Sequence, residues 1–173
     1  MILDNYFKQT ANNKYILIIF VILFGFFLRA YDLSNQGYWM DEWNNLFWTN
    51  PQYNFTQSNE IFLWGELAPS PYLHVLKYFF YFFGYTTENG KLLSIILGTL
   101  CIPASMILSY QIKQTNLYLY SGFLVSLNIF LIWQSQEVRL ASFALLMSLI
   151  NISLFITIFN NQFTKKIFFV SFI

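Results

Sequence analysis

Two short segments carry the residues best suited to chemistry: Asp41-Glu42, and the run 135–139 with Glu137 and Arg139. A carboxylate that aromatic neighbours partly remove from water has a raised pKa, which suits a general base. An arginine can bind phosphate or carboxylate oxygens in pairs. Plainer readings stay open. Asp41 and Glu42 would then be a solvated pair on a surface helix, and Glu137 and Arg139 a rim pair that fixes topology.

The second segment lies between two apolar runs, which sets expectations for its charges. We expect Glu137 at the N-terminus of the following helix, where the helix dipole favours an anion. Residues two apart do not face each other on a helix, so Glu137 and Arg139 should each have a partner elsewhere. For Arg139 that partner would be a phosphate or an acid of the preceding long loop.

Three further cationic or titratable side chains could contact a lipid phosphate. His74 and Lys77 are three residues apart and share one face of a short helix that Pro71 opens. A solvated His74 is the alternative. Lys91 begins a long apolar run, where it could either extend towards water or bind a phosphate.

The composition points to lipid as the solvent for the elements that must position these residues. Apolar residues make up 57% of the 173 residues and charged residues 10%, against about 25% charged in soluble domains. The net charge of +1 gives no support for a nucleic-acid partner. The single cysteine, Cys101, provides neither a disulfide framework nor a metal cluster.

Hydropathy predicts an all-α, polytopic transmembrane protein with one membrane domain over residues 1–173. A span needs about 20 apolar residues, and four runs are long enough: 14–31, 92–111, 117–134 and 139–159. The run Pro71–Gly84 is too short, so we expect it to lie at the interface, with a crossing as the alternative. Another run starts at 167 and stops at Ile173. We therefore expect residues 1–173 to be the N-terminal part of a larger chain, inactive alone.

The lysines favour one orientation. With the N-terminus inside and 71–84 not crossing, the lysines that fall on the inner side are Lys8, Lys14, Lys113, Lys165 and Lys166. Residues 32–90 then form a long extracytoplasmic loop, and both acidic segments face the outside.

Within that loop, aromatic spacing predicts an interfacial helix. Trp39, Trp43 and Phe47 are four apart and line one helix face, with Leu46 beside them. Aromatic side chains of this kind anchor a helix in the headgroup layer.

The order of these motifs resembles the N-terminal third of the protein-mannosyltransferase-like glycosyltransferases of the GT-C superfamily, over most of residues 15–160. The matching segments, in order, are Leu28-Arg29-Ala30-Tyr31, Asp41-Glu42, Pro69-Ser70-Pro71-Tyr72-Leu73 with Phe83-Gly84, Lys91-Leu92-Leu93-Ser94 and Ser135-Gln136-Glu137-Val138-Arg139. The chain departs from the family pattern at Ser70, Lys91, Leu93 and Ala141, which leaves the donor sugar open.

The resemblance implies a hexosyl- or pentosyltransferase, usually inverting. It would take sugar from a polyprenyl-phosphate donor to a glycan, lipid or protein acceptor on the extracytoplasmic side. Asp41 would be the base on the acceptor hydroxyl, Glu42 would assist, and Glu137 and Arg139 would match a second motif near the active site. The phosphate's charge needs cations, for which the candidates are Arg139, Lys77 and Lys91. A divalent cation is left open, because metal dependence varies within the superfamily.

The expected location is an integral membrane position, the plasma membrane in a bacterium, with the active site facing outside. Two other classes remain: a transporter or flippase, and a non-catalytic assembly subunit. Acidic residues near the middle of a span would favour the transporter. A protein that keeps its function as Asp41→Asn would favour the assembly subunit.

Overall fold

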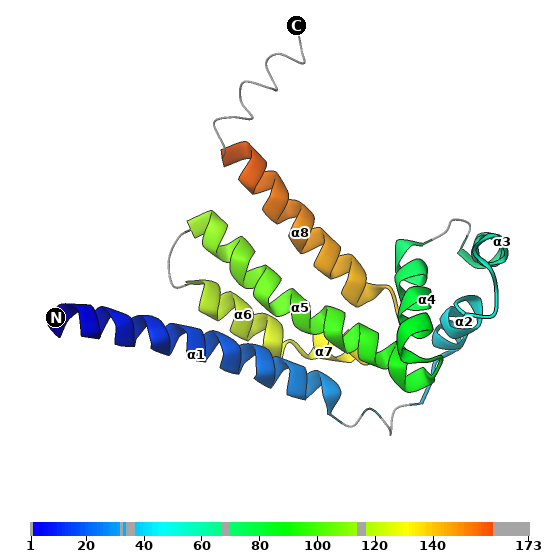
Figure 1. Cartoon of the computed structure of the whole chain (residues 1–173), viewed down its shortest axis with the longest axis horizontal. Coiled ribbons are helices and arrows are strands. Elements are labelled where there is room, and N and C mark those ends of the chain that lie inside the picture. The colour runs from blue at the N-terminus through cyan, green and yellow to red at the C-terminus, as the bar shows by residue number, and fades with distance from the viewer. Residues whose placement is uncertain (1, 32, 34–36, 67–69, 114–116, 161–173) are drawn as a thin grey trace, which may run out of the picture.

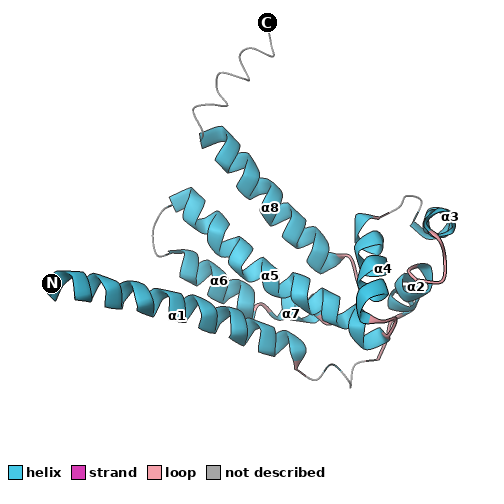
Figure 2. Ribbon diagram, viewed as in Figure 1, coloured by secondary structure: helices cyan, strands magenta, loops and turns pink. Residues whose placement is uncertain are grey.

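The computed structural model describes residues 2–31, 33, 37–66, 70–113 and 117–160. All regular structure in this part of the chain is helical (Figures 1 and 2), which confirms the all-α prediction. The helices are α1 (Ile2–Ala30), α2 (Met40–Trp48), α3 (Phe55–Glu66), α4 (Pro71–Phe83), α5 (Thr87–Lys113), α6 (Leu117–Leu127), α7 (Ile129–Ser135) and α8 (Ala141–Asn160). The span expected to begin at 167 lies outside the described residues.

Three described helices are long and apolar enough to cross a membrane: Asn13–Ala30 within α1, the whole of α5, and Ala141–Phe159 within α8. Helices α6 and α7 meet the same criteria only as a bent pair, which would make a fourth span. Three to four such helices are compatible with an integral membrane protein. Helix α4 has 13 residues and is not among the candidate spans, as expected from its length.

The third predicted span, 117–134, is not one straight helix. The helix breaks at Asn128, and α6 and α7 meet at 60°. Asn128 has an extended backbone, and its side-chain oxygen accepts the amide hydrogen of Leu131 at 3.1 Å. Asparagine competes with the helix for backbone hydrogen bonds and favours this N-cap position. An apolar pattern alone does not reveal such a break.

Helix α5 begins earlier than the predicted span 92–111, at Thr87. Gly84 ends α4 with a φ of 98°, a value that favours glycine. Thr86 is the N-cap residue of α5, and its hydroxyl accepts the amide hydrogen of Asn89 at 3.2 Å. The last residues of the expected loop 32–90 therefore belong to α5.

Helix α5 is the centre of the bundle, with α8 on one side and α6 and α1 on the other (Figure 1). Small residues permit the close approach of α5 and α7: a Cβ on Gly98 would lie 2.0 Å from the Ser135 hydroxyl oxygen. This use of small residues is typical of helix packing in membranes. Helices α2, α3 and α4 gather at the end of the bundle where α1 ends and α5 begins.

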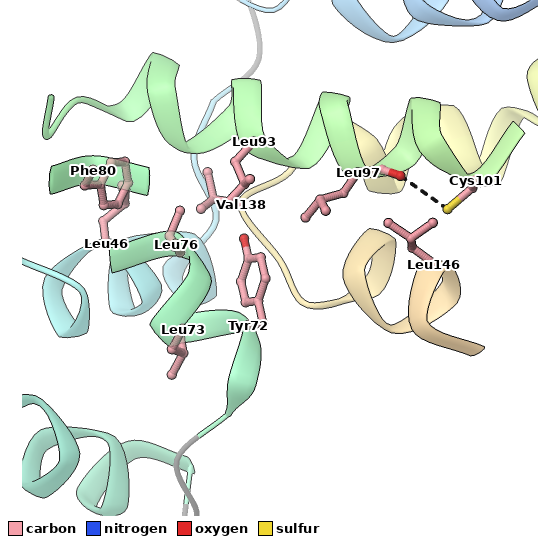
Figure 3. Close-up of a cluster of buried hydrophobic side chains, with 10 residues drawn as sticks. All are labelled: Leu46, Tyr72, Leu73, Leu76, Phe80, Leu93, Leu97, Cys101, Val138 and Leu146. Carbon is pink, nitrogen blue, oxygen red and sulfur yellow. Dashed lines mark hydrogen bonds between the residues drawn. The ribbon is translucent and has the colours of Figure 1, made fainter. Parts of the chain in front are cut away.

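One apolar cluster joins α2 and α4 to the bundle (Figure 3). Its central members come from four elements: Leu46 of α2, Phe80 of α4, Leu93 of α5 and Val138 of the α7–α8 turn. Leu46 was expected beside the exposed aromatic face of its helix and is instead 4% exposed. The cluster holds α2 against the α7–α8 turn, which positions the charged residues of both.

Candidate functional site

The two acidic segments meet where α2 lies against the α7–α8 turn. Asp41 and Glu42 stand in the first turn of α2, and Glu137 and Arg139 belong to the turn that precedes α8. Contacts between the two segments join residues 96 and 98 positions apart in the chain. The structure therefore brings together four of the seven side chains that the sequence singled out.

Glu42 is the most firmly held of the four. Its side chain is 1% exposed, and its oxygens accept the amide hydrogens of Val138 at 2.7 Å and Trp39 at 3.0 Å. One helical turn along, Asn45 donates to the Val138 carbonyl at 2.8 Å. Side chains three apart on α2 thus bind both backbone polar groups of Val138. These contacts give Glu42 a docking role.

Asp41 is the accessible carboxylate. It forms an ion pair and hydrogen bond with Arg139, and the two side chains are 66% and 32% exposed. Neutralising an acid of the loop was one of the two roles expected for Arg139. An exposed ion pair contributes little stability, so a ligand that competes for either partner meets a small energetic cost.

The carboxyl group of Glu137 is buried and has no hydrogen bond to any described residue. The side chain is 3% exposed, and Arg139 Nη1 lies 3.5 Å from Oε2. Burial raises the pKa of Glu137, the charge of Arg139 opposes this, and Glu42 and Asp41 add to it. Glu137 was expected at the N-terminus of the next helix. Helix α8 begins only at Ala141, so Glu137 lies before the first turn, where the helix dipole would favour an anion.

Lys91 is buried rather than placed at a rim, with 2% exposure. Its ammonium nitrogen lies 4.2 Å from the centre of the Tyr38 ring and donates to the Leu33 carbonyl at 3.4 Å. Lys91 therefore fastens the segment before α2 to α5. Its charge also acts to lower the pKa of Glu137, which places it in electrostatic range of the cluster.

Two hollows flank the charged cluster, by which we mean Asp41, Glu42, Glu137 and Arg139. The first, which we name the Asp41 hollow, has a volume of about 310 Å³ and is lined by Asp41, Asn44, Trp48, Gln134 and Arg139 among others. The second, the Glu137 hollow, has a volume of about 450 Å³ and is lined by Gly37, Tyr38, Trp39, Trp133 and Glu137. Arg139 contacts Asp41 and Glu137, one carboxylate from each hollow.

His74 and Lys77 lie elsewhere. They line a third hollow of about 260 Å³ with Tyr53, Tyr78 and Tyr81. Lys77 donates to the Tyr53 carbonyl and to the Ser58 hydroxyl, and burial lowers its pKa. The structure does not bring these two residues into the hollows of the carboxylates, so their contact with a lipid phosphate stays a prediction.

Two residues of the site region were missed by sequence reasoning. Gln136, inside the motif, donates to the carbonyls of Arg29 at 3.2 Å and Tyr31 at 3.0 Å, and so ties the end of α1 to the turn. Arg29, which the sequence marked only as part of the first matching segment, is 0% exposed. It donates to the carbonyls of Val125 at 3.0 Å and Ser126 at 3.4 Å, groups near the end of α6. The helix break at Asn128 leaves the carbonyl groups at the end of α6 without helical partners. Asn128 was therefore the sequence signal for this contact.

The described residues contain no group of three or more histidine, cysteine or acidic side chains positioned to hold a metal ion. Whether the protein uses a cation stays open. Comparison with protein-family models, with curated proteins and with solved structures found no significant match for this chain.

Proposed function

We propose that this protein is a membrane glycosyltransferase. It would transfer a sugar from a polyprenyl-phosphate donor to a glycan, lipid or protein acceptor on the extracytoplasmic side. The observation that carries the proposal is the contact between Asp41-Glu42 and the Glu137–Arg139 turn, beside two hollows at one end of a bundle of candidate spans. A transferase needs a base, a cation for the leaving group and room for two substrates.

In the proposed reaction Asp41 is the base. It is exposed and lines the Asp41 hollow, so an acceptor hydroxyl can reach it. Asp41 removes the hydroxyl proton, and the oxygen attacks the anomeric carbon of the donor. The bond between that carbon and the phosphate oxygen breaks, and the phosphate leaves on its lipid. Attack from the side opposite the leaving group inverts the anomeric configuration.

Arg139 is the cation that we assign to the leaving phosphate. A guanidinium offers paired donors to phosphate oxygens, and Arg139 is partly exposed in the same hollow as Asp41. When it binds the phosphate, its ion pair with Asp41 weakens, which frees Asp41 to accept a proton. Lys91 is buried beneath Tyr38 and acts on the cluster through its charge.

The placement of lysines supports an extracytoplasmic site. Lys14 stands at the start of the candidate span Asn13–Ala30 and Lys113 at the end of α5, and both are exposed. Helices α2, α3 and α4 gather instead where α1 ends and α5 begins (Figure 1). Of the described cations nearer α2, Arg29 and Lys91 are buried, Arg139 is paired with Asp41, and Lys77 is partly buried, so they contribute less to a loop charge. The positive-inside rule then favours an inner position for the end that carries Lys14 and Lys113 and an outer position for the α2–α4 region.

A transporter draws less support from these spans. Among the described candidate spans the one acidic residue is Glu88, and it stands in the first turn of α5 rather than near its middle. The transfer assay on Asp41→Asn distinguishes an enzyme from a non-catalytic assembly subunit.

The test is transfer by the intact protein in native membranes. The donors are a panel of polyprenyl-phosphate sugars, and the wild type is compared with Asp41→Asn. We expect about a 10²–10⁴-fold lower rate in the variant, the usual contribution of a general base. Glu88→Gln, an exposed carboxylate on α5, is the matched control and should transfer normally.

Equal transfer by wild type and Asp41→Asn would remove Asp41 as the base and keep the enzyme class. No transfer by a correctly inserted wild type, over the whole donor panel, would favour the transporter or the assembly subunit.

A further inference from the structure

The Glu137 hollow contains a buried carboxyl group with unused hydrogen-bonding capacity. Glu137 is 2% exposed, and neither of its carboxyl oxygens has a hydrogen-bond partner among the described residues, although its neighbour Glu42 uses both oxygens. Burying a carboxyl group without hydrogen bonds is costly, and proteins seldom do so without a compensating role. Each oxygen exposes less than 1 Å², so a ligand in the hollow can donate hydrogen bonds to them only after the Glu137 side chain turns towards it.

The other walls of this hollow are mainly aromatic. Tyr38, Trp39 and Trp133 line it, and the two tryptophans are 59% and 45% exposed. Tyr38 is fixed from behind, because Lys91 lies over its ring and Trp43 packs at 5.6 Å between ring centres. Flat, preformed aromatic walls with one convergent polar group are typical of a small-ligand site.

The ligand that fits these walls is a polyhydroxylated ring. The C–H faces of a sugar are apolar and pack on indole or phenol rings, while its hydroxyl groups donate to a carboxyl group. A free phosphate would instead meet apolar walls and an acidic residue. The raised pKa of Glu137 also suits a neutral ligand, since a protonated carboxyl group can both donate to and accept from hydroxyls.

We propose that the Glu137 hollow binds one sugar ring, with Glu137 holding its hydroxyls and Trp39 or Trp133 stacking on its face. The inference rests on the proposed function in one respect: the ring belongs to the donor or the acceptor of that reaction. Arg139 touches carboxylates of both hollows. A ring bound by Glu137 is therefore separated from Asp41 by a single side chain, that of Arg139.

The structure offers two variants that act on this hollow by different means. Glu137→Leu removes the hydrogen-bonding group, and Arg139 keeps its ion pair with Asp41, so the change leaves no buried charge without a partner. Gly37→Phe adds bulk at the wall, where a Cβ meets no atom within 4 Å. The matched controls are Glu88→Leu, an exposed carboxylate, and Gly37→Ala, which changes the same residue without filling the space.

The first experiment measures binding alone. Intact protein in lipid nanodiscs is titrated with a panel of methyl glycosides, and saturation-transfer NMR reports the dissociation constants. We expect Glu137→Leu to raise the dissociation constant of the best glycoside by about tenfold or more, the effect of losing a hydrogen bond to a charged group. Gly37→Phe should raise the same constant because its ring takes up space in the hollow. Both controls should bind the glycoside as the wild type does. Glu137→Gln should keep part of the wild-type affinity. Unchanged binding in both hollow variants would overturn the proposal.

The second experiment locates the ring and separates this inference from the proposed function. In the transfer assay, a raised KM for the polyprenyl-phosphate sugar assigns the hollow to the donor, and a raised KM for the acceptor assigns it to the acceptor. Glycoside binding that depends on Glu137, without any transfer, would keep the hollow and overturn the enzyme. Transfer with unchanged KM values in both variants would overturn the hollow and keep the enzyme.

Discussion

Glu42 and Glu137 are both almost fully buried, yet the protein treats them in opposite ways. At the start of α2, Glu42 accepts two backbone amide hydrogens. In the α7–α8 turn, the carboxyl oxygens of Glu137 accept no hydrogen bond from the described residues, and Arg139 lies 3.5 Å away. A carboxylate that backbone groups satisfy is part of the scaffold, whereas one left unsatisfied is available to a ligand. The comparison separates structure from function within one cluster.

The same contrast extends to the helices around them. Glu42 and Asn45 hold Val138 by its amide and carbonyl groups, so the turn has a fixed position against α2. Glu137 immediately precedes Val138, and the fixed backbone therefore sets where its side chain lies. The docking residue and the proposed binding residue depend on the same peptide units.

The largest effect on the fold should come from Glu42→Ala, which would break the scaffold side of the comparison. The change leaves the amides of Val138 and Trp39 without a partner, and each charge-assisted bond contributes about 1.5–3 kcal/mol. We expect a loss of roughly 2–5 kcal/mol in unfolding free energy, measured by denaturant titration in detergent. Glu60→Ala, an exposed acid in α3, is the control. An unchanged midpoint in Glu42→Ala would contradict the docking role.

Asn45→Ala should have a smaller effect in the same direction. It removes one neutral hydrogen bond to the Val138 carbonyl, and we expect a loss of about 1–2 kcal/mol by the same titration. Its neighbour Asn44 is exposed and provides the matched control, Asn44→Ala. Equal losses in the two variants would mean that the bond to Val138 contributes nothing specific.

Glu137→Gln should have the smallest effect and the opposite sign. The folded protein raises the pKa of Glu137 by burial, with Asp41 and Glu42 adding to the shift and Arg139 and Lys91 opposing it. Between the ordinary and the raised pKa, the folded state binds more protons than the unfolded state. The wild type therefore loses stability as pH rises through this window, and the glutamine variant does not.

We accordingly expect Glu137→Gln to melt roughly 2–4 °C higher at neutral pH, the shift that ~1 kcal/mol produces in a domain of this size. The difference should shrink in acid, where both side chains are neutral. Thermal melts of both proteins across the acidic-to-neutral range measure it. A wild type that is the more stable at neutral pH would mean that Arg139 outweighs burial.

The three carboxylates at this site also show what reading the chain could and could not predict. Acidic residues are rare here, so Asp41, Glu42 and Glu137 stand out wherever the chain folds. Their division into an exposed, a satisfied and an unsatisfied carboxylate does not follow from spacing. It depends on Val138, whose amide reaches Glu42 from 96 residues away along the chain. The sequence also grouped Lys77 with the cluster, and the structure seats it against Tyr53 and Ser58 instead.

By itself the sequence determined the helical class and the approximate positions of the apolar helices, because their length and composition decide them locally. It also marked the charged segments, because charge is scarce in an apolar chain. Tertiary structure alone decided the burial of Arg29 and Lys91 and the different hydrogen bonding of the carboxylates. The physical reason is that hydrogen bonding and burial of a side chain depend on which distant backbone groups packing brings to it, and local pattern carries no record of them.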